Sequence, residues 1–197
     1  YLPSEIIHSA GGMAVGVLGG GDHKQISKGD AYYQSYSCHM PRSIIEIALD
    51  KQMDHFDGFI FPSICDVIRN LSGIFKQHKL GKFVKYMDFP QNFMPQIGGK
   101  FYQQEMEHVL EYIKEINGVE VTTDKLNHSI GLYNKNREMI EFIYNIRQDY
   151  PWRLSISDVY TIIRAGMVIP VEEHNAILED VCEHIKKDIG TPQDKIK

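Results

Sequence analysis

Two cysteines occupy matching settings in this sequence, and thiols are well suited to bind a metal or to act as a nucleophile. Cys65 comes directly before a helix predicted at 66–78, and Cys38 comes just before a helix predicted at 41–51. The N-terminus of a helix lowers the pKa of a thiol and favours the thiolate, which is the form that binds metals. Arg42 and Arg69 follow one turn later and add positive charge. A metal or catalytic role is therefore open to the pair, although ordinary partly buried cysteines are the commoner case.

The third cysteine has a different setting. Cys182 lies on the apolar stripe of the last predicted helix, together with Leu178, Val181, Ile185 and Ile189. We expect it to be part of the core, because an apolar helix face does not stabilise a thiolate. Three scattered cysteines do not form a disulfide framework. The separation of Cys38 and Cys65 (65 minus 38, or 27 positions) also matches no compact zinc or ferredoxin spacing.

Polar and aromatic residues surround Cys38. His39 is either a loop histidine bonded to the backbone or a group that transfers protons. Tyr32 and Tyr33 could line a pocket for a substrate, or they could cover the edge of a sheet. With Arg42 and Arg69 they are our candidates for substrate binding, and His39 is the candidate catalytic residue. Two common nucleotide motifs are missing, because the sequence contains neither the G-x-G-x-x-G fingerprint nor a P-loop.

The elements that must position these residues follow an alternating pattern in the first half of the chain. Apolar strands are predicted at 13–18, 58–61 and 82–87, and helices at 3–10, 41–51 and 66–78. Strands that alternate with helices indicate a parallel sheet with right-handed crossovers. Ligands gather at the carboxyl ends of such strands, and we expect Cys38 and Cys65 to lie close together there.

The second half of the chain changes to helical periodicity. Helices are predicted from about residue 100, from 123 to the residue before Pro151, at 157–168 and at 171–189. We therefore predict an α/β fold in which a parallel Rossmann-like sheet layer is followed by a mainly helical layer. The expected domains are an α/β domain over 1–97, which carries Cys38 and Cys65, and a helical region over 98–197.

Charge and composition narrow the classes of partner. The net charge of -5 and the pI near 6.0 provide no basic stripe for nucleic acid or an anionic membrane. No apolar run approaches the roughly 20 residues of a transmembrane helix, and the start lacks a signal peptide, so we expect a cytoplasmic protein. Because the chain begins without Met and stops in a charged stretch, we expect it to be a fragment of a larger subunit.

Several stretches together carry a family resemblance through their order and spacing. They are 3–11, 30–42, 61–71, 88–90, 129–137 and 170–175. In these stretches the chain resembles the family of 2-hydroxyacyl-CoA dehydratases and ATP-dependent (class I) benzoyl-CoA reductases. The residues at 29–43 look most like those of the benzoyl-CoA reductase B subunit.

The resemblance implies an oxygen-sensitive enzyme that contains a 4Fe-4S cluster held by three cysteines. Cys38 and Cys65 match the first two ligands, and the family's third ligand lies in a further C-terminal domain rather than at Cys182. By this resemblance, 1–97 is the α/β cluster-binding domain, and the helical region over 98–197 leads towards a missing C-terminal domain. The implied partners are a homologous second catalytic subunit, a separate ATP-hydrolysing iron-sulfur activator and a coenzyme A thioester. The activator would explain why no P-loop occurs in this chain.

Three functions remain open at this point. The first is low-potential electron transfer to an aromatic acyl-CoA thioester, of the benzoyl-CoA reductase type used in anaerobic aromatic degradation, which gives a dienoyl-CoA. The second is radical dehydration of a 2-hydroxyacyl-CoA on the same scaffold. The third is a non-catalytic structural partner subunit whose cysteines hold no cluster.

Overall fold

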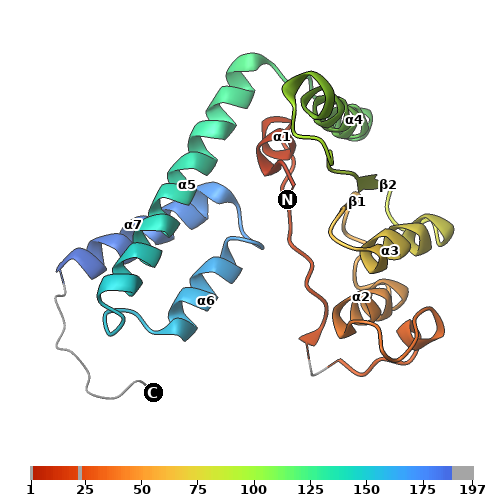
Figure 1. The fold of residues 1–197 in the computed structure, drawn as a ribbon, viewed down its shortest axis with the longest axis horizontal. Helices are drawn as coiled ribbons and strands as arrows, with labels where there is room; N and C mark the ends of the chain where they lie inside the picture. The colour runs from red at the N-terminus through yellow and green to blue at the C-terminus, as the bar shows by residue number, and fades with distance from the viewer. Residues whose placement is uncertain (1, 22–23, 188–197) are drawn as a thin grey trace. The chain divides into compact units, whose positions relative to one another are not determined.

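The computed structural model describes residues 2–21 and 24–187 and divides the chain into two compact units (Figure 1). The first, which we call the α/β unit, comprises Tyr1–Pro3 and Val17–Glu120. The second, the helical unit, comprises Ser4–Gly16 and Val121–Lys197. Each unit has its own hydrophobic core and is described separately below.

A small parallel sheet organises the α/β unit. Strands β1 (Gly58–Pro62) and β2 (Phe83–Met87) pair in parallel, from Gly58 opposite Phe83 to Pro62 opposite Met87. Helix α3 (Asp66–Gln77) is the crossover between them, as parallel strands require. The predicted combination of an α/β fold, a parallel sheet and a mainly helical remainder is confirmed.

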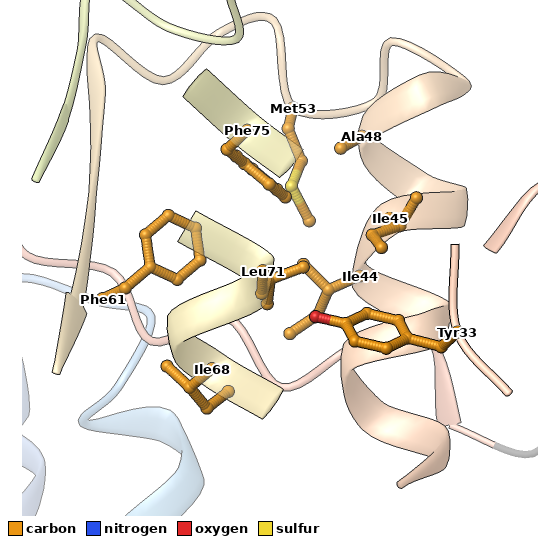
Figure 2. Packing of buried hydrophobic residues seen from close by; sticks show 9 residues of the cluster. All are labelled: Tyr33, Ile44, Ile45, Ala48, Met53, Phe61, Ile68, Leu71 and Phe75. Carbon is orange, nitrogen blue, oxygen red and sulfur yellow. The ribbon is translucent and has the colours of Figure 1, made fainter. Parts of the chain in front are cut away.

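Helix α2 (His39–Leu49) packs with α3 to form the core of this unit. Both helices are amphipathic, because their apolar residues recur at three- and four-residue steps. Figure 2 shows the buried side chains converging between the two helices and β1. They are Tyr33, Ile44, Ile45, Ala48, Met53, Phe61, Ile68, Leu71 and Phe75.

The remainder of the α/β unit follows β2. Residues 88–94 are irregular, as predicted, and a π-helical turn, η3 (Pro95–Gly99), leads into α4 (Lys100–Asn117). Helix α4 ends at Gly118, whose φ of 68° is the left-handed conformation that favours glycine at a helix end. A short 3-10 turn, η2 (Gly29–Ala31), lies in the loop before α2.

The helical unit contains α1 (Ser4–Ser9), α5 (Thr123–Asp149), α6 (Ile156–Ala165) and α7 (Val171–Lys187). Thr122 and Ser155 cap α5 and α6 by accepting a hydrogen bond from the backbone N-H three residues later. The core joins residues of α5, α6 and α7, which are Ile143, Val159, Leu178, Cys182 and Ile185.

One predicted strand is wrong. Residues 13–18 do not pair with either strand; instead the Gly16 N-H donates a hydrogen bond of 2.7 Å to the Met167 carbonyl within the helical unit. An apolar run satisfies its backbone groups wherever partners exist, and here the turn after α6 supplies one. In consequence, Cys65 follows a strand of the sheet whereas Cys38 does not.

Two further expectations concern boundaries. The contacts place α4 with the α/β unit and Ser4–Gly16 with the helical unit. The predicted division after residue 97 concerned the domains of the whole subunit, and it stays a prediction. The last predicted helix was expected to reach Ile189, and its final two residues lie outside the described residues. Over residues 2–21 and 24–187, no helix combines the length and the apolar composition needed to cross a bilayer.

Candidate metal centre beside the carboxyl end of β1

Cys38 and Cys65 occupy the same structural position on neighbouring helices. Cys38 is the N-cap residue of α2, and Cys65 is the N-cap residue of α3. Both are exposed free thiols, and neither side chain makes the capping hydrogen bond. Two thiols are thus presented at the positive ends of helix dipoles.

Tyr33 connects the two cysteine-bearing segments. It precedes Cys38 by five positions (38 minus 33), yet its side chain is buried between α2 and α3. Figure 2 shows the ring beside Ile44 with the hydroxyl on the side of α3. The hydroxyl donates a 2.7 Å hydrogen bond to the Val67 carbonyl, in the first turn after Cys65. The loop before Cys38 is therefore fastened to the segment that carries Cys65.

The environment of Tyr33 keeps this phenol protonated. Burial, followed by the nearby Cys65 thiol, raises the pKa of Tyr33 to about 12. A protonated hydroxyl is required for the bond to Val67, because a carbonyl only accepts. Tyr33 was predicted to bind substrate. Its buried ring and engaged hydroxyl instead fit a role in positioning the two cysteines, and its substrate role remains an untested prediction.

A carboxylate of α2 holds the loop that leads to Cys38. Glu46 is buried and accepts hydrogen bonds from the backbone N-H groups of Ser27 (2.9 Å) and Gly29 (2.8 Å) and from the Ser27 hydroxyl (3.2 Å). Burial by itself would raise the pKa of Glu46, but these donors outweigh burial and lower it. Gly29 lies so close to α2 that a Cβ there would be 2.2 Å from the Arg42 carbonyl oxygen.

A second carboxylate strengthens this attachment from the end of α2. Asp50 pairs with Lys24 (2.6 Å) and Lys28 (2.5 Å), both from the same loop. The hydrogen bonds from these two lysines lower the pKa of Asp50 to about 2. We call Glu46, Asp50 and their partners at 24–29 the loop clamp. It fixes the segment from which Tyr33 and Cys38 emerge.

The two predicted arginines have different surroundings. Arg42 is largely buried and pairs with Asp30 (3.0 Å), while its Nε is buried without a hydrogen-bond partner among the described residues. Arg69 is exposed, lies 5.4 Å from the centre of the Tyr86 ring and is 3.9 Å from Asp66. Only Arg69 therefore presents its charge at the surface beside Cys65. Substrate binding by either residue stays a prediction.

A polar chain that was not predicted from the sequence lies next to Cys65. The Arg69 Nε donates to the Tyr86 hydroxyl (3.4 Å), and that hydroxyl donates to Ser63 Oγ (2.9 Å). Tyr86 is the penultimate residue of β2, and Ser63 follows β1 directly. We call Arg69, Tyr86 and Ser63 the edge chain.

Of the two remaining candidates, Tyr32 lies away from Cys65, whereas His39 adjoins Cys38. Tyr32 donates to or accepts from His78 Nε2 at 2.7 Å, and His78 caps the far end of α3 from Cys65. His39 is the exposed first residue of α2, next to Cys38. Their predicted roles in substrate binding and catalysis, respectively, remain untested.

The residues present fit part of a cluster-binding site. A 4Fe-4S cluster in a protein is held by thiolates, and Cys38 and Cys65 offer two exposed thiols at helix N-termini. Across residues 2–21 and 24–187, no three His, Cys, Asp or Glu side chains come together as a metal site. Cys182 is buried in the core of the helical unit. Cys38 and Cys65 could therefore hold a cluster only with a donor from elsewhere.

Sequence signals for the missed residues were weak. Glu46 was detectable as a carboxylate within the apolar stretch of α2, between Ile45 and Ile47. Tyr86 and Ser63 each lie at a strand end, but their pairing depends on the register of β1 and β2, which sequence periodicity does not define.

Comparison with known proteins agrees with the motifs. Residues 1–197 match the family model described as 2-hydroxyglutaryl-CoA dehydratase, D-component. The C subunit of benzoyl-CoA reductase from Thauera aromatica is 49% identical over 180 residues, which cover 91% of this chain and 47% of that protein. The stretch at 29–43 had pointed to the B subunit of such an enzyme, whereas this relative is a C subunit.

Dehydratase subunits match over a similar span at lower identity. Lactoyl-CoA dehydratase subunit beta from Anaerotignum propionicum is 26% identical over 194 residues, or 98% of this chain and 51% of that protein. The (R)-2-hydroxyglutaryl-CoA dehydratase, subunit beta, from Acidaminococcus fermentans is 28% identical over 186 residues, or 94% and 49%. The chain spans about half the length of these relatives. From the match along its full length, this chain belongs to the 2-hydroxyglutaryl-CoA dehydratase D-component family.

Proposed function

We propose that this chain is part of a catalytic iron-sulfur subunit that transfers low-potential electrons to an aromatic acyl-CoA thioester, as in benzoyl-CoA reductase. The observation that carries the proposal is the pair of exposed thiols, Cys38 and Cys65, on adjacent helix N-termini joined through Tyr33. The 49% identity to a benzoyl-CoA reductase subunit supports the substrate class.

Cys38 and Cys65 are the residues that would hold a 4Fe-4S cluster, with the remaining donor from outside the described residues. When bound, such a cluster supplies a one-electron centre whose potential depends on nearby charge and hydrogen bonds. The residues of this chain provide the surroundings. The N-termini of α2 and α3 and the Arg69 guanidinium favour negative charge at this edge, and the loop clamp and Tyr33 keep the thiols in place.

Dehydration of a 2-hydroxyacyl-CoA is the second candidate function. Three of the relatives are dehydratase subunits, from lactoyl-CoA, (R)-2-hydroxyglutaryl-CoA and (R)-phenyllactyl-CoA dehydratases. Their identities of 22% to 28% are well below the 49% of the benzoyl-CoA reductase subunit, so the reductase is the function that we favour.

The proposal includes two protein partners. The names of the relatives describe subunits of multi-subunit enzymes, and we propose a homologous second subunit together with a separate ATP-hydrolysing iron-sulfur activator. A non-catalytic structural role is the alternative. It would require that Cys38 and Cys65 hold no cluster in the assembled enzyme.

The test uses the full-length subunit, purified without oxygen together with its partner and activator. Benzoyl-CoA and a 2-hydroxyacyl-CoA are supplied separately with ATP and a reductant, and the products are identified by mass spectrometry. Formation of a dienoyl-CoA supports the reductase. An enoyl-CoA from the hydroxyacyl substrate alone identifies a dehydratase, and absence of iron from the purified subunit leaves only the structural role.

A further inference from the structure

We propose that Ser63 donates a hydrogen bond to the carbonyl oxygen of the acyl-CoA thioester, and that Tyr86 and Arg69 are positioning residues that orient it. The proposal rests on the proposed function, because it assumes that a thioester reacts beside Cys65. It names a substrate contact that the sequence motifs did not indicate. It also gives Arg69 a role through Tyr86, in place of direct contact with the substrate.

The hydrogen bonds of the edge chain run in one direction. Arg69 carries only donors, so its Nε must donate to the Tyr86 oxygen (3.4 Å). The Tyr86 hydroxyl therefore keeps its own hydrogen, which it donates to Ser63 Oγ (2.9 Å). Within the described part of the chain, the Ser63 hydroxyl in turn has no acceptor for its hydrogen. The chain thus ends in a donor that is available to a ligand.

The Ser63 donor is held at the end of a paired strand. The Ser63 N-H donates to the Met87 carbonyl (2.9 Å), which continues the pairing of β1 and β2 by one residue. Ser63 is half-buried, and Cys65 follows two positions later. The hydroxyl is therefore fixed by a strand pair rather than by a free loop, as a group that acts on a reacting atom needs to be.

The edge chain also polarises its terminal donor. The edge chain begins at a guanidinium cation, and each hydrogen bond in such a chain polarises the next. An arginine side chain stays protonated in proteins, so the edge chain begins at a permanent cation. A carbonyl oxygen that gains negative charge during electron uptake binds a polarised donor more strongly than the neutral carbonyl does. The hydrogen bond from Ser63 is therefore expected to affect kcat more than KM.

The test compares Ser63→Ala, Ser63→Thr and Tyr86→Phe in the full-length enzyme with its partner and activator. Tyr112→Phe is the matched control, because Tyr112 stacks on Phe83 at the opposite end of β2, with ring centres 5.3 Å apart. Steady-state kcat and KM for the thioester are measured for each variant. The iron content and the electron paramagnetic resonance spectrum of the reduced, substrate-free enzyme are recorded in parallel.

We expect Ser63→Ala to lower kcat about 100-fold, in the range found when one oxyanion donor is removed, with little change in KM. Tyr86→Phe should lower kcat about 10-fold, because the hydroxyl of Ser63 remains but is no longer oriented. Ser63→Thr should restore most of the rate, since it keeps the hydroxyl. Iron content, the substrate-free spectrum and the Tyr112→Phe kinetics should match the wild type.

Several results would overturn the proposal. A kcat for Ser63→Ala within twofold of the wild type, with normal iron, would exclude the substrate contact and leave the proposed function intact. Equal losses of rate and iron in Ser63→Ala and Tyr86→Phe would show that the edge chain only supports the local fold. If Ser63→Ala does not fold, a wild-type rate in Tyr86→Phe is the overturning result. A wild-type enzyme without iron would instead reject the proposed function itself.

Discussion

The three cysteines of this chain show how one residue type serves different purposes in the two units. Cys38 and Cys65 are exposed at the N-termini of α2 and α3 in the α/β unit. Cys182 is buried on α7 in the helical unit, and its burial raises the pKa of the thiol. The first two thiols are therefore open to metals, whereas the third fills a core. The three cysteines are distinguished by their positions, at the N-terminus of a helix or on its buried face.

Polar side chains differ between the units in the same way. In the helical unit His174 and Asn175 are buried, and each is bonded to Asn136 at 2.8 Å. His174 Nε2 also lies 2.9 Å from the Ile162 carbonyl, so this nitrogen carries the hydrogen. All these groups have protein partners, and they join α5, α6 and α7. In the α/β unit, by contrast, the edge chain ends in the Ser63 hydroxyl, which has no acceptor among the described residues.

The comparison also explains part of the sequence resemblance. Three of its stretches, at 3–11, 129–137 and 170–175, come together in the helical unit. His8 Nδ1 lies 2.8 Å from Ser129 Oγ, and His8 Nε2 lies 2.9 Å from the Glu172 carboxylate. Ser129 is buried and donates its hydroxyl hydrogen to the Lys125 carbonyl (3.0 Å), so it is not an exposed nucleophile. These contacts hold α1 against α5 and α7.

The largest effect is expected when a proposed cluster ligand is removed, and it tests the distinction between the exposed cysteines and Cys182. Replacing Cys38 or Cys65 by Ala in the full-length enzyme should abolish thioester turnover, because each change removes a proposed cluster ligand. The sheet should remain folded, since both residues are exposed. Turnover is measured with partner and activator, and circular dichroism checks the fold. Cys182→Ala is the matched control and should retain turnover; activity in the Cys38→Ala and Cys65→Ala enzymes would contradict the assignment.

The next effect concerns the polar interior of the helical unit. His174→Ala should lower the free energy of unfolding by about 3 kcal/mol, because it opens a cavity and removes the hydrogen bonds from His174 to Asn136 and to the Ile162 carbonyl. Urea unfolding of the full-length protein measures the change. The control is His184→Ala, an exposed histidine on the same helix. Equal stability of the two variants would show that the buried network is not what joins these helices.

A smaller effect is expected from the loop clamp. Glu46→Gln should lower the free energy of unfolding by about 2 kcal/mol, because a charged acceptor of three hydrogen bonds is replaced by a neutral amide. The exposed Glu111 on α4, changed to Gln, is a control for charge alone.

The loop clamp also predicts a pH dependence. The pKa of Glu46 is below its ordinary value of 4.5 in the folded protein. Its contribution to stability is therefore fully present above that ordinary value and is lost as the pH falls through the lowered folded pKa. The difference in stability between wild type and Glu46→Gln should shrink on acidification in urea titrations. A difference that grows at low pH would mean that the folded pKa is raised.

The smallest effect concerns Cys182, whose burial contrasts with the exposure of Cys38 and Cys65. Cys182→Ala should lower the free energy of unfolding by about 1 kcal/mol, because the replacement removes one buried sulfur from the core. In protein from which any cluster has been stripped, iodoacetamide should alkylate Cys38 and Cys65 faster than Cys182, since the buried thiol has a raised pKa. Peptide mass mapping over time measures the rates. Alkylation of Cys182 at the same rate as the other two would place it at the surface.

Much of this arrangement could be predicted from the sequence, because helices and paired strands have clear periodicities. The positions of Cys38 and Cys65 before α2 and α3 followed from Pro41 and from the strand that ends at Pro62. The strand expected at 13–18 could not be excluded, since an apolar run has the same pattern whether or not it finds a neighbouring strand.

The contacts between distant segments were beyond local patterns. The bonds from Tyr33 to Val67 and from Tyr86 to Ser63 join residues 34 and 23 positions apart. They depend on how α2, α3 and the strands pack, which no single stretch determines. Tyr33 was accordingly predicted to line a substrate pocket or to cover the edge of the sheet, but its burial between α2 and α3 was not predicted.

The central claim is that Cys38 and Cys65 are ligands of one cluster. The most direct test is the iron and acid-labile sulfide content of anaerobically purified full-length protein, measured in parallel for wild type, Cys38→Ala, Cys65→Ala and Cys182→Ala. We predict about four iron atoms per chain in wild type and Cys182→Ala, as for a 4Fe-4S cluster, and clear loss of iron in the other two. Equal iron in all four proteins would contradict the claim.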